Sequence, residues 1–154
     1  MSVAIGRKVP DFSAASTGGE VRLSKLKGRK LVLFFYPKDN TPGCTNEAGD
    51  FRDLHAAFAE ARALVLGVSR DSLKSHEGFK GKLGLPYELV SDPDEALCEQ
   101  FGVMKLKTMY GRQVRGIERS TFVIDTAGKL AHEWRGVKVP GHVAEVLEVV
   151  RSIS

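Results

Sequence analysis

The sequence predicts an α/β fold in which helices flank a mixed central sheet. Two apolar runs, residues 31–36 and 63–69, are rich in branched and aromatic residues, as is typical of strands buried on both faces. A segment with helical spacing of its apolar residues follows each run. The last third of the chain then predicts two strands around a tight turn and a final amphipathic helix. Parallel and antiparallel strands together imply a mixed sheet covered on both faces.

The N-terminal half predicts a hairpin followed by two strand-helix pairs. The turn Thr17-Gly18-Gly19 divides residues 12–23 in the manner of a small hairpin. The helix after the first strand is expected to begin at Thr41 and to continue through apolar positions three or four residues apart. These positions are Phe51, Leu54, Phe58 and Ala61. The helix after the second strand is expected over residues 72–83, with His76 on its buried side.

The C-terminal half predicts shorter elements, then a strand pair and a closing helix. The expected elements are a strand at 87–90, a helix from Asp92 to about Phe101, a basic surface loop or hairpin at 105–119, strands at 121–125 and 129–135, and a helix from Pro140 onward. The strand pair turns at Thr126-Ala127-Gly128. In the closing helix the inward positions are Val143, Val146, Leu147 and Val150.

Length and composition indicate one globular domain, residues 1–154. Of the 154 residues, 42% are hydrophobic and 27% are charged, which suffices for a substantial core. No apolar run approaches the roughly 18 residues of a membrane span, and the first residues do not resemble a secretory signal. We therefore expect no membrane association and a cytoplasmic location. The net charge of +4 is spread over 23 basic and 19 acidic residues, which favours a solvated surface over nucleic-acid binding.

Cys44 stands at a predicted helix start, where a thiol ionises more easily than a free one. Thr41 suits the N-cap and Pro42 the first helical position, so Cys44 falls in the first turn. Unpaired backbone N–H groups and the helix dipole favour an anion there. A thiol with a pKa of about 8.5 is roughly 3% ionised at pH 7, whereas one with a pKa of about 6 is roughly 90% ionised. Glu47, on the same side of the helix, opposes ionisation, so a cation from elsewhere is required.

Pro37, Thr41 and Cys44 are spaced as P-x-x-x-T-x-x-C, and Arg119 begins the later segment RSTF. Together these residues closely resemble the active-site motif of the peroxiredoxins. The run PGCTNEAGDF is most similar to the subgroup that includes the bacterioferritin comigratory proteins. The resemblance covers nearly the whole chain and implies a thioredoxin-like fold with an N-terminal β-hairpin extension. It also implies a thiol-dependent peroxidase that reduces hydrogen peroxide and organic hydroperoxides in antioxidant defence.

The resemblance implies a role for each motif residue. Cys44 is the expected nucleophile, which becomes a sulfenic acid when it attacks a peroxide. Arg119 is the expected cation, because a guanidinium stays charged and offers forked donors to thiolate and peroxide. The Thr41 hydroxyl can both accept from and donate to the peroxide, and Pro37 is expected to shield the thiolate from water. Glu47 has two alternatives: a solvated carboxylate, which base rates favour, or a carboxylate that orients Arg119 or a neighbouring basic group.

The second cysteine, Cys98, is either a buried structural thiol or a resolving cysteine, and a structural role would leave a one-cysteine cycle. Many relatives carry a resolving cysteine at the positions of Gly49 or Phe79-Lys80, and this chain has none there. Cys98 lies beside Leu97 and Phe101 in a predicted helix, so a buried structural thiol is the favoured interpretation. Resolution by Cys98 would require the two Cα atoms to come within about 7 Å. In a one-cysteine cycle an external thiol, such as glutathione, glutaredoxin or a thioredoxin-type partner, would reduce the sulfenic acid instead.

Other classes of protein fit the sequence less well. A thioredoxin-type dithiol oxidoreductase needs a C-x-x-C pair, which is missing, and a cysteine hydrolase needs one of the four histidines beside Cys44. No paired ligand spacing predicts a metal and no glycine-rich loop predicts a nicotinamide or flavin, so no cofactor is expected. The alternative function is a peroxide-responsive redox sensor or a thiol-disulfide oxidoreductase without efficient turnover. Relatives occur as monomers and as homodimers, and the sequence does not choose between them.

Overall fold

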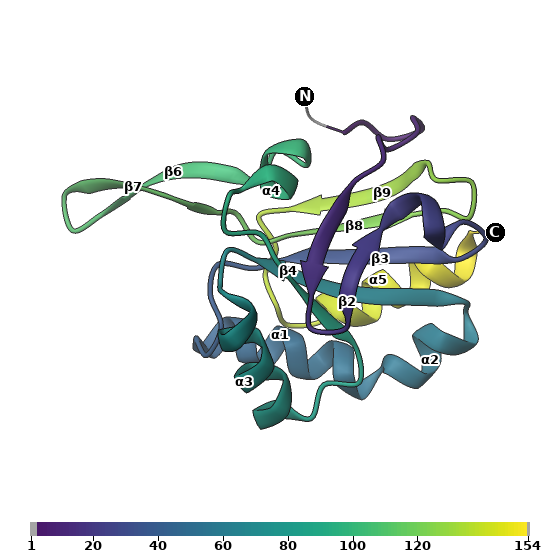
Figure 1. Ribbon diagram of the computed structural model, residues 1–154, viewed down its shortest axis with the longest axis horizontal. Helices are drawn as coiled ribbons and strands as arrows, with labels where there is room; N and C mark the ends of the chain where they lie inside the picture. Colours follow the sequence, from purple (N-terminus) through teal and green to yellow (C-terminus); the bar gives the residue numbers. More distant parts are fainter. Residues whose placement is uncertain (1–2, 154) are drawn as a thin grey trace.

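Residues 3–153 are the part of the 154-residue chain that the computed structural model describes (Figure 1). The strands are β1 (Ser13–Ser16), β2 (Gly19–Arg22), β3 (Lys30–Phe35), β4 (Ala63–Ser69), β5 (Glu88–Ser91), β6 (Met104–Met109), β7 (Arg112–Ile117), β8 (Ser120–Ile124) and β9 (Leu130–Arg135). The helices are η1 (Leu23–Leu26), α1 (Pro42–Asp53), α2 (His55–Glu60), α3 (Leu73–Leu83), α4 (Ala96–Gln100) and α5 (His142–Ser152). Within residues 3–153, no helix is long and apolar enough to cross a membrane.

Seven strands form one mixed sheet in the order β2-β1-β5-β4-β3-β8-β9. Strands β3, β4 and β5 are parallel, and helices connect them as parallel pairing requires. Strand β8 runs antiparallel to β3 and sets Ser120 opposite Phe35. The N-terminal hairpin joins the edge of the sheet through antiparallel pairing of β1 with β5. The predicted mixed sheet and N-terminal hairpin are therefore confirmed.

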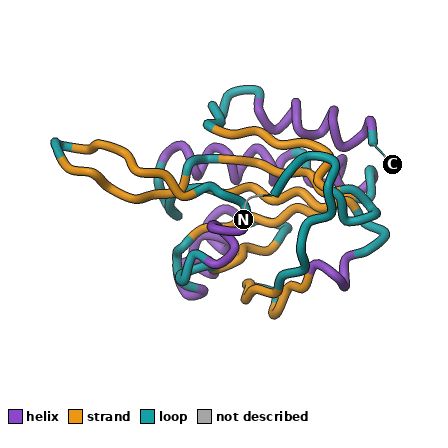
Figure 2. Tube along the Cα trace, turned by 90° about the horizontal axis from the view of Figure 1, so that it is seen from above, coloured by secondary structure: helices purple, strands orange, loops and turns teal. Residues whose placement is uncertain are grey.

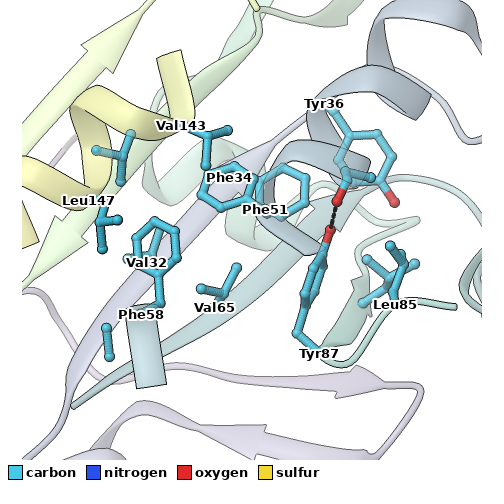
Figure 3. Packing of buried hydrophobic residues seen from close by; sticks show 14 of the residues in the cluster. Val32, Phe34, Tyr36, Phe51, Phe58, Val65, Leu85, Tyr87, Val143 and Leu147 are labelled. Atoms are coloured by element: carbon cyan, nitrogen blue, oxygen red, sulfur yellow. Dashed lines mark hydrogen bonds between the residues drawn. The ribbon is translucent and has the colours of Figure 1, made fainter. Parts of the chain in front are cut away.

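The sheet separates two apolar clusters, because side chains alternate between its faces. Phe34 and Tyr36 point toward the face that α1, α2, α3 and α5 cover. There Phe34 stacks on Phe51, with 4.5 Å between the ring centroids (Figure 3). Leu33 and Phe35 point to the opposite face and pack with α4 and the N-terminal segment. The two faces of the sheet thus have separate cores, and each contains one cysteine.

The helix expected over residues 41–61 is in fact two helices. Leu54, at φ −102° and ψ 8°, separates α1 from α2. Neither proline nor glycine marks the break in the sequence. Phe51 and Phe58 still pack together, with ring centroids 5.7 Å apart. The helical spacing of apolar residues continues across the break between α1 and α2, which is why the spacing alone predicted a single helix.

Strands β6 and β7 form a separate hairpin that extends away from the main sheet (Figure 2). This arrangement confirms the hairpin alternative for the basic stretch at 105–119. Tyr110 and Gly111, with φ of 53° and 75°, make its tight turn. The hairpin ends at Ile117, two residues before Arg119. Its base therefore lies where β8 begins and where the chain returns to the main sheet.

Candidate active site

The loop between β3 and α1 places three motif residues at the carboxyl end of a parallel strand, a common location for sites in α/β sheets. Pro37 is half-buried just after β3. Thr41 is the extended N-cap residue of α1, and Pro42 occupies the first position of the helix, as expected. Cys44 follows in the first turn and is only 1% exposed. The helix start therefore brings its unpaired N–H groups close to a buried sulfur.

Arg119 contacts the sulfur of Cys44 although the two residues are 75 positions apart in the sequence. Its Nη2 donates to Sγ at 3.3 Å. The pairing of β8 with β3 explains the contact, since it brings Ser120 opposite Phe35. Burial lowers the pKa of Arg119, but the negative charges of Glu47 and Cys44 outweigh burial, and the net shift is upward. A permanent cation therefore faces the sulfur, where it favours the thiolate.

Gly43 leaves room for this guanidinium. A Cβ atom at position 43 would lie 3.1 Å from Nη2 of Arg119, closer than ordinary packing allows. Since the φ of Gly43 is not positive, backbone freedom does not explain the glycine. The absence of a side chain is what lets Arg119 reach the first turn of α1.

Glu47 is fully buried beside Arg119, so the favoured expectation of a solvated carboxylate was wrong. Nη1 of Arg119 donates to Oε1 of Glu47 at 2.7 Å. Burial raises the pKa of Glu47 to about 7, although the charge and the hydrogen bond of Arg119 act in the opposite direction. Oε2 has no hydrogen-bond partner among the described residues. The spacing of Cys44, Glu47, Ala48 and Phe51 on one face of α1 was the signal that could have predicted this burial.

Thr41 occupies the predicted N-cap position but does not make the predicted capping bond. Its Oγ1 donates to the carbonyl oxygen of Lys38 at 2.8 Å, and no helix N–H donates to the side chain. The hydroxyl is therefore oriented by the loop rather than by the helix. Its oxygen keeps lone pairs that can accept a hydrogen bond from a substrate.

Asp39 and His76 form a buried pair behind this loop that the sequence did not identify as functional. Oδ1 of Asp39 accepts from the Tyr36 hydroxyl at 2.6 Å, and Oδ2 accepts from the Ser75 hydroxyl at 2.8 Å. Nδ1 of His76 lies 2.8 Å from Oδ2, and Nε2 lies 2.9 Å from the carbonyl oxygen of Val90. Helical spacing correctly predicted that His76 is buried. No pattern in the sequence indicated Asp39.

Asp39, Asp71 and His76 are close enough to hold a metal ion, with ligand atoms within 4.8 Å of one another. These atoms already have protein partners, however. Oδ2 of Asp71 accepts from the N–H of Asp39 at 2.9 Å and from the Ser69 hydroxyl at 2.6 Å. A bound ion would compete with these donors, so the cluster fits a loop anchor better than a metal centre.

Cys98 lies in the other core. It is fully buried in α4 and packs in the apolar cluster on the face of the sheet opposite Cys44. Burial raises the pKa of Cys98, and the hydrogen bond and charge of Asp92 raise it further. The expected buried thiol is confirmed, and the sheet lies between the two cysteines.

Comparisons with known proteins agree with this geometry. Residues 5–133 match the AhpC/TSA family. The chain is 52% identical to Peroxiredoxin Bcp of Bacillus subtilis, and the match covers 100% of this chain and 99% of that protein. The solved structure of peroxiredoxin Q from Xanthomonas campestris has a TM-score of 0.90 at 48% identity, with 97% of this chain and 96% of that chain covered. Structures of the bacterioferritin comigratory protein of the same organism, which concern its alkyl peroxide reduction activity, match with a TM-score of 0.90 at 47% identity over 97% of this chain and 98% of that chain.

The chain belongs to the AhpC/TSA family and has its thioredoxin-like fold. Within that family it is a peroxiredoxin of the group that contains Bcp and peroxiredoxin Q. It is therefore a thiol-dependent peroxidase, whose substrate is a hydroperoxide and whose reductant is a thiol.

Proposed function

We propose that Cys44 is the peroxidatic nucleophile and that Arg119, Thr41 and Pro37 complete its site. The 3.3 Å contact between Nη2 of Arg119 and Sγ of Cys44 is the observation that carries this proposal. A charged donor at this distance favours the thiolate, which is the reactive form of cysteine. Thr41 supplies a hydroxyl at the helix start, and Pro37 adds no N–H that would attract water to the sulfur.

In the proposed reaction the thiolate of Cys44 attacks one oxygen of the hydroperoxide. An S–O bond forms as the O–O bond breaks, so the sulfur is oxidised to a sulfenic acid and the peroxide is reduced. The second oxygen leaves as hydroxide or alkoxide and takes a proton from water. Arg119 stabilises the negative charge while it moves from sulfur to the leaving oxygen. Hydrogen peroxide and organic hydroperoxides both contain the O–O bond that this reaction breaks, so both can be substrates.

A one-cysteine cycle fits the positions of the two thiols best. An external thiol condenses with the sulfenic acid to give a mixed disulfide and water, and a second thiol then releases Cys44 together with a disulfide. Two observations support this cycle over resolution by Cys98. The sheet lies between the two cysteines, and the raised pKa of Cys98 disfavours the thiolate needed for attack. Glutathione, glutaredoxin and thioredoxin-type proteins are the candidate reductants.

Three further expectations stay predictions. These are a single domain over residues 1–154, a cytoplasmic location, and a monomeric or homodimeric state.

Substitution of Cys44 tests the proposed site directly. Cys44→Ser should abolish thiol-driven consumption of hydrogen peroxide, because a serine hydroxyl is not ionised near neutral pH and cannot replace the thiolate. Cys98→Ser is the matched control and should retain turnover. Undiminished turnover in Cys44→Ser would end the assignment.

Mass spectrometry after one equivalent of peroxide separates the cycles. A sulfenic acid at Cys44, or its mixed adduct with an added thiol, supports the one-cysteine cycle, whereas a Cys44–Cys98 disulfide supports internal resolution. A protein that is oxidised but fails to cycle with any thiol would instead be a redox sensor.

A further inference from the structure

Residues 37–41 carry two of the motif side chains but lie outside the helices and strands. Asn40, in this turn, has a φ of 66°, a conformation that few residues other than glycine adopt readily. Asparagine tolerates this conformation better than most residues do, so the turn suits position 40. The contacts that join the turn to the rest of the fold converge on Asp39, which is only 4% exposed.

Two hydroxyl groups donate hydrogen bonds to the Asp39 carboxylate, although a carboxylate oxygen of Asp71 also lies within 4.8 Å. The hydroxyl of Tyr36 donates to Oδ1, and the hydroxyl of Ser75 donates to Oδ2. Burial raises the pKa of Asp39, but the bonds from His76, Tyr36 and Ser75 outweigh it, and the net shift is downward. The carboxylate is therefore ionised, although it is almost inaccessible to solvent.

Both ring nitrogens of His76 have buried partners. Nε2 lies 2.9 Å from the carbonyl oxygen of Val90, on β5. Nδ1 lies 2.8 Å from Oδ2 of Asp39 and 3.4 Å from the Tyr36 hydroxyl. Because His76 has no exposed surface, these contacts are not open to competition from water.

We infer that the buried hydrogen bond between His76 and Asp39 positions the loop that carries Pro37 and Thr41. The inference rests on the proposed role of that loop in peroxide reduction. A buried polar network whose members are hydrogen-bonded holds one geometry, and here it joins the loop to α3 and β5. From Asp39 the constraint passes to its neighbour Lys38, whose carbonyl oxygen holds the Thr41 hydroxyl at 2.8 Å. Asp39 and His76 are thus positioning residues and do not themselves touch the peroxide.

The positioning role predicts a specific split between two reactions of Cys44. In Asp39→Asn, an isosteric change that replaces one acceptor oxygen of this network with an amide N–H donor, the rate with hydrogen peroxide should fall roughly tenfold or more, because Thr41 is no longer held in place. Alkylation of Cys44 by iodoacetamide uses Arg119 but not Thr41, and should change by less than about twofold. Glu77→Gln, which removes an exposed carboxylate next to His76 on α3, is the matched control and should change neither rate. Equal losses in both reactions, or an unchanged peroxide rate in Asp39→Asn, would refute the positioning role.

Discussion

Cys44 and Cys98 are both buried thiols on helices, yet the structure surrounds them with opposite charges. Cys44, 1% exposed, receives a hydrogen bond from the guanidinium of Arg119. Cys98, 0% exposed, lies beside the carboxylate of Asp92, which accepts the backbone N–H of Cys98 at 2.8 Å. Burial alone disfavours a thiolate at both positions. The difference in expected reactivity therefore comes from the sign of the nearest charge and not from burial.

The same comparison shows why the helix start is not sufficient. Both cysteines lie near the N-terminus of a helix, α1 for Cys44 and α4 for Cys98. At α4, the carboxylate of Asp92 accepts hydrogen bonds from the N–H groups of Leu97 and Cys98. The N-terminus of α4 is therefore already occupied by an anionic side chain. At α1 no side chain caps the helix. The free N–H groups there remain available to an anionic sulfur.

Removal of Arg119 should have the largest effect, because it would make the surroundings of Cys44 resemble those of Cys98. In Arg119→Ala we expect the rate with hydrogen peroxide to fall roughly 10²-fold to 10³-fold, since the charged donor to the reacting atoms is lost. Alkylation of Cys44 by iodoacetamide at pH 6 to 7 should also slow. Stopped-flow mixing with peroxide and timed alkylation measure the two effects.

Arg119→Lys is the control for this experiment. It keeps a positive charge near Glu47 but loses the forked geometry, so it should retain more alkylation than peroxide reduction. An alkylation rate in Arg119→Ala equal to that of the parent protein would show that another group stabilises the thiolate.

Glu47 provides a pH-dependent prediction for the Cys44 side of the comparison. Burial raises the pKa of Glu47 to about 7, whereas in the unfolded chain a glutamate titrates near 4.3. Between these two pH values the folded protein binds more protons than the unfolded chain, so the free energy of unfolding falls as pH rises. Glu47→Gln keeps an acceptor for Arg119 but does not titrate. The variant should gain stability relative to the parent from pH 4.5 to pH 7, by up to about 3 kcal/mol.

Urea unfolding at several pH values between 4.5 and 8 checks this expectation. Parallel stability curves for parent and Glu47→Gln would mean that Glu47 remains ionised throughout, held by Arg119. Asp53→Asn, an exposed change at the end of the same helix, is a suitable control and should leave the pH dependence unaltered.

The sequence predicted the motif residues but not the way they are held. Continuous apolar runs identified β3 and β4, and helical apolar spacing identified the closing helix and the buried side of α3. The inner face of α1 carries a charged residue, Glu47, and a preference based on residue type alone placed it in solvent. Its buried partner, Arg119, comes from a distant segment that the pairing of β8 with β3 brings close. Pairing between distant strands is not encoded in local spacing, and this limits prediction from sequence.

The turn after β3 shows the same limit. No local pattern singles out Asp39, because its partners are Tyr36, directly after β3, and Ser75 and His76 on α3. Leu54, which divides α1 from α2, gave no signal either, since the apolar spacing continues through it. In both cases tertiary contacts decide what a local pattern leaves open.

Gly43 tests how closely Arg119 must approach the sulfur. In Gly43→Ala the new Cβ would lie 3.1 Å from Nη2 of Arg119, so the guanidinium must shift by a few tenths of an ångström. We expect alkylation of Cys44 and peroxide reduction to slow by roughly threefold to tenfold, because a charged hydrogen bond weakens as it lengthens. Gly49→Ala is the matched control on the same helix, since its Cβ would lie 3.5 Å from Nη2 of Arg52, an ordinary contact. Equal rates in Gly43→Ala and Gly49→Ala would show that the site tolerates a displaced guanidinium.

Cys98 should give the smallest effect on activity and so completes the comparison. Cys98→Ala removes one buried sulfur from the core beside Leu97 and Phe101, so the free energy of unfolding should fall by about 1 kcal/mol. Thiol-driven peroxide turnover should stay unchanged, because the sheet separates this core from Cys44. Urea unfolding and a coupled turnover assay measure the two quantities. If Cys98→Ala loses turnover while alkylation of Cys44 persists, then Cys98 takes part in the cycle, and the fold must open locally to bring the two sulfurs together.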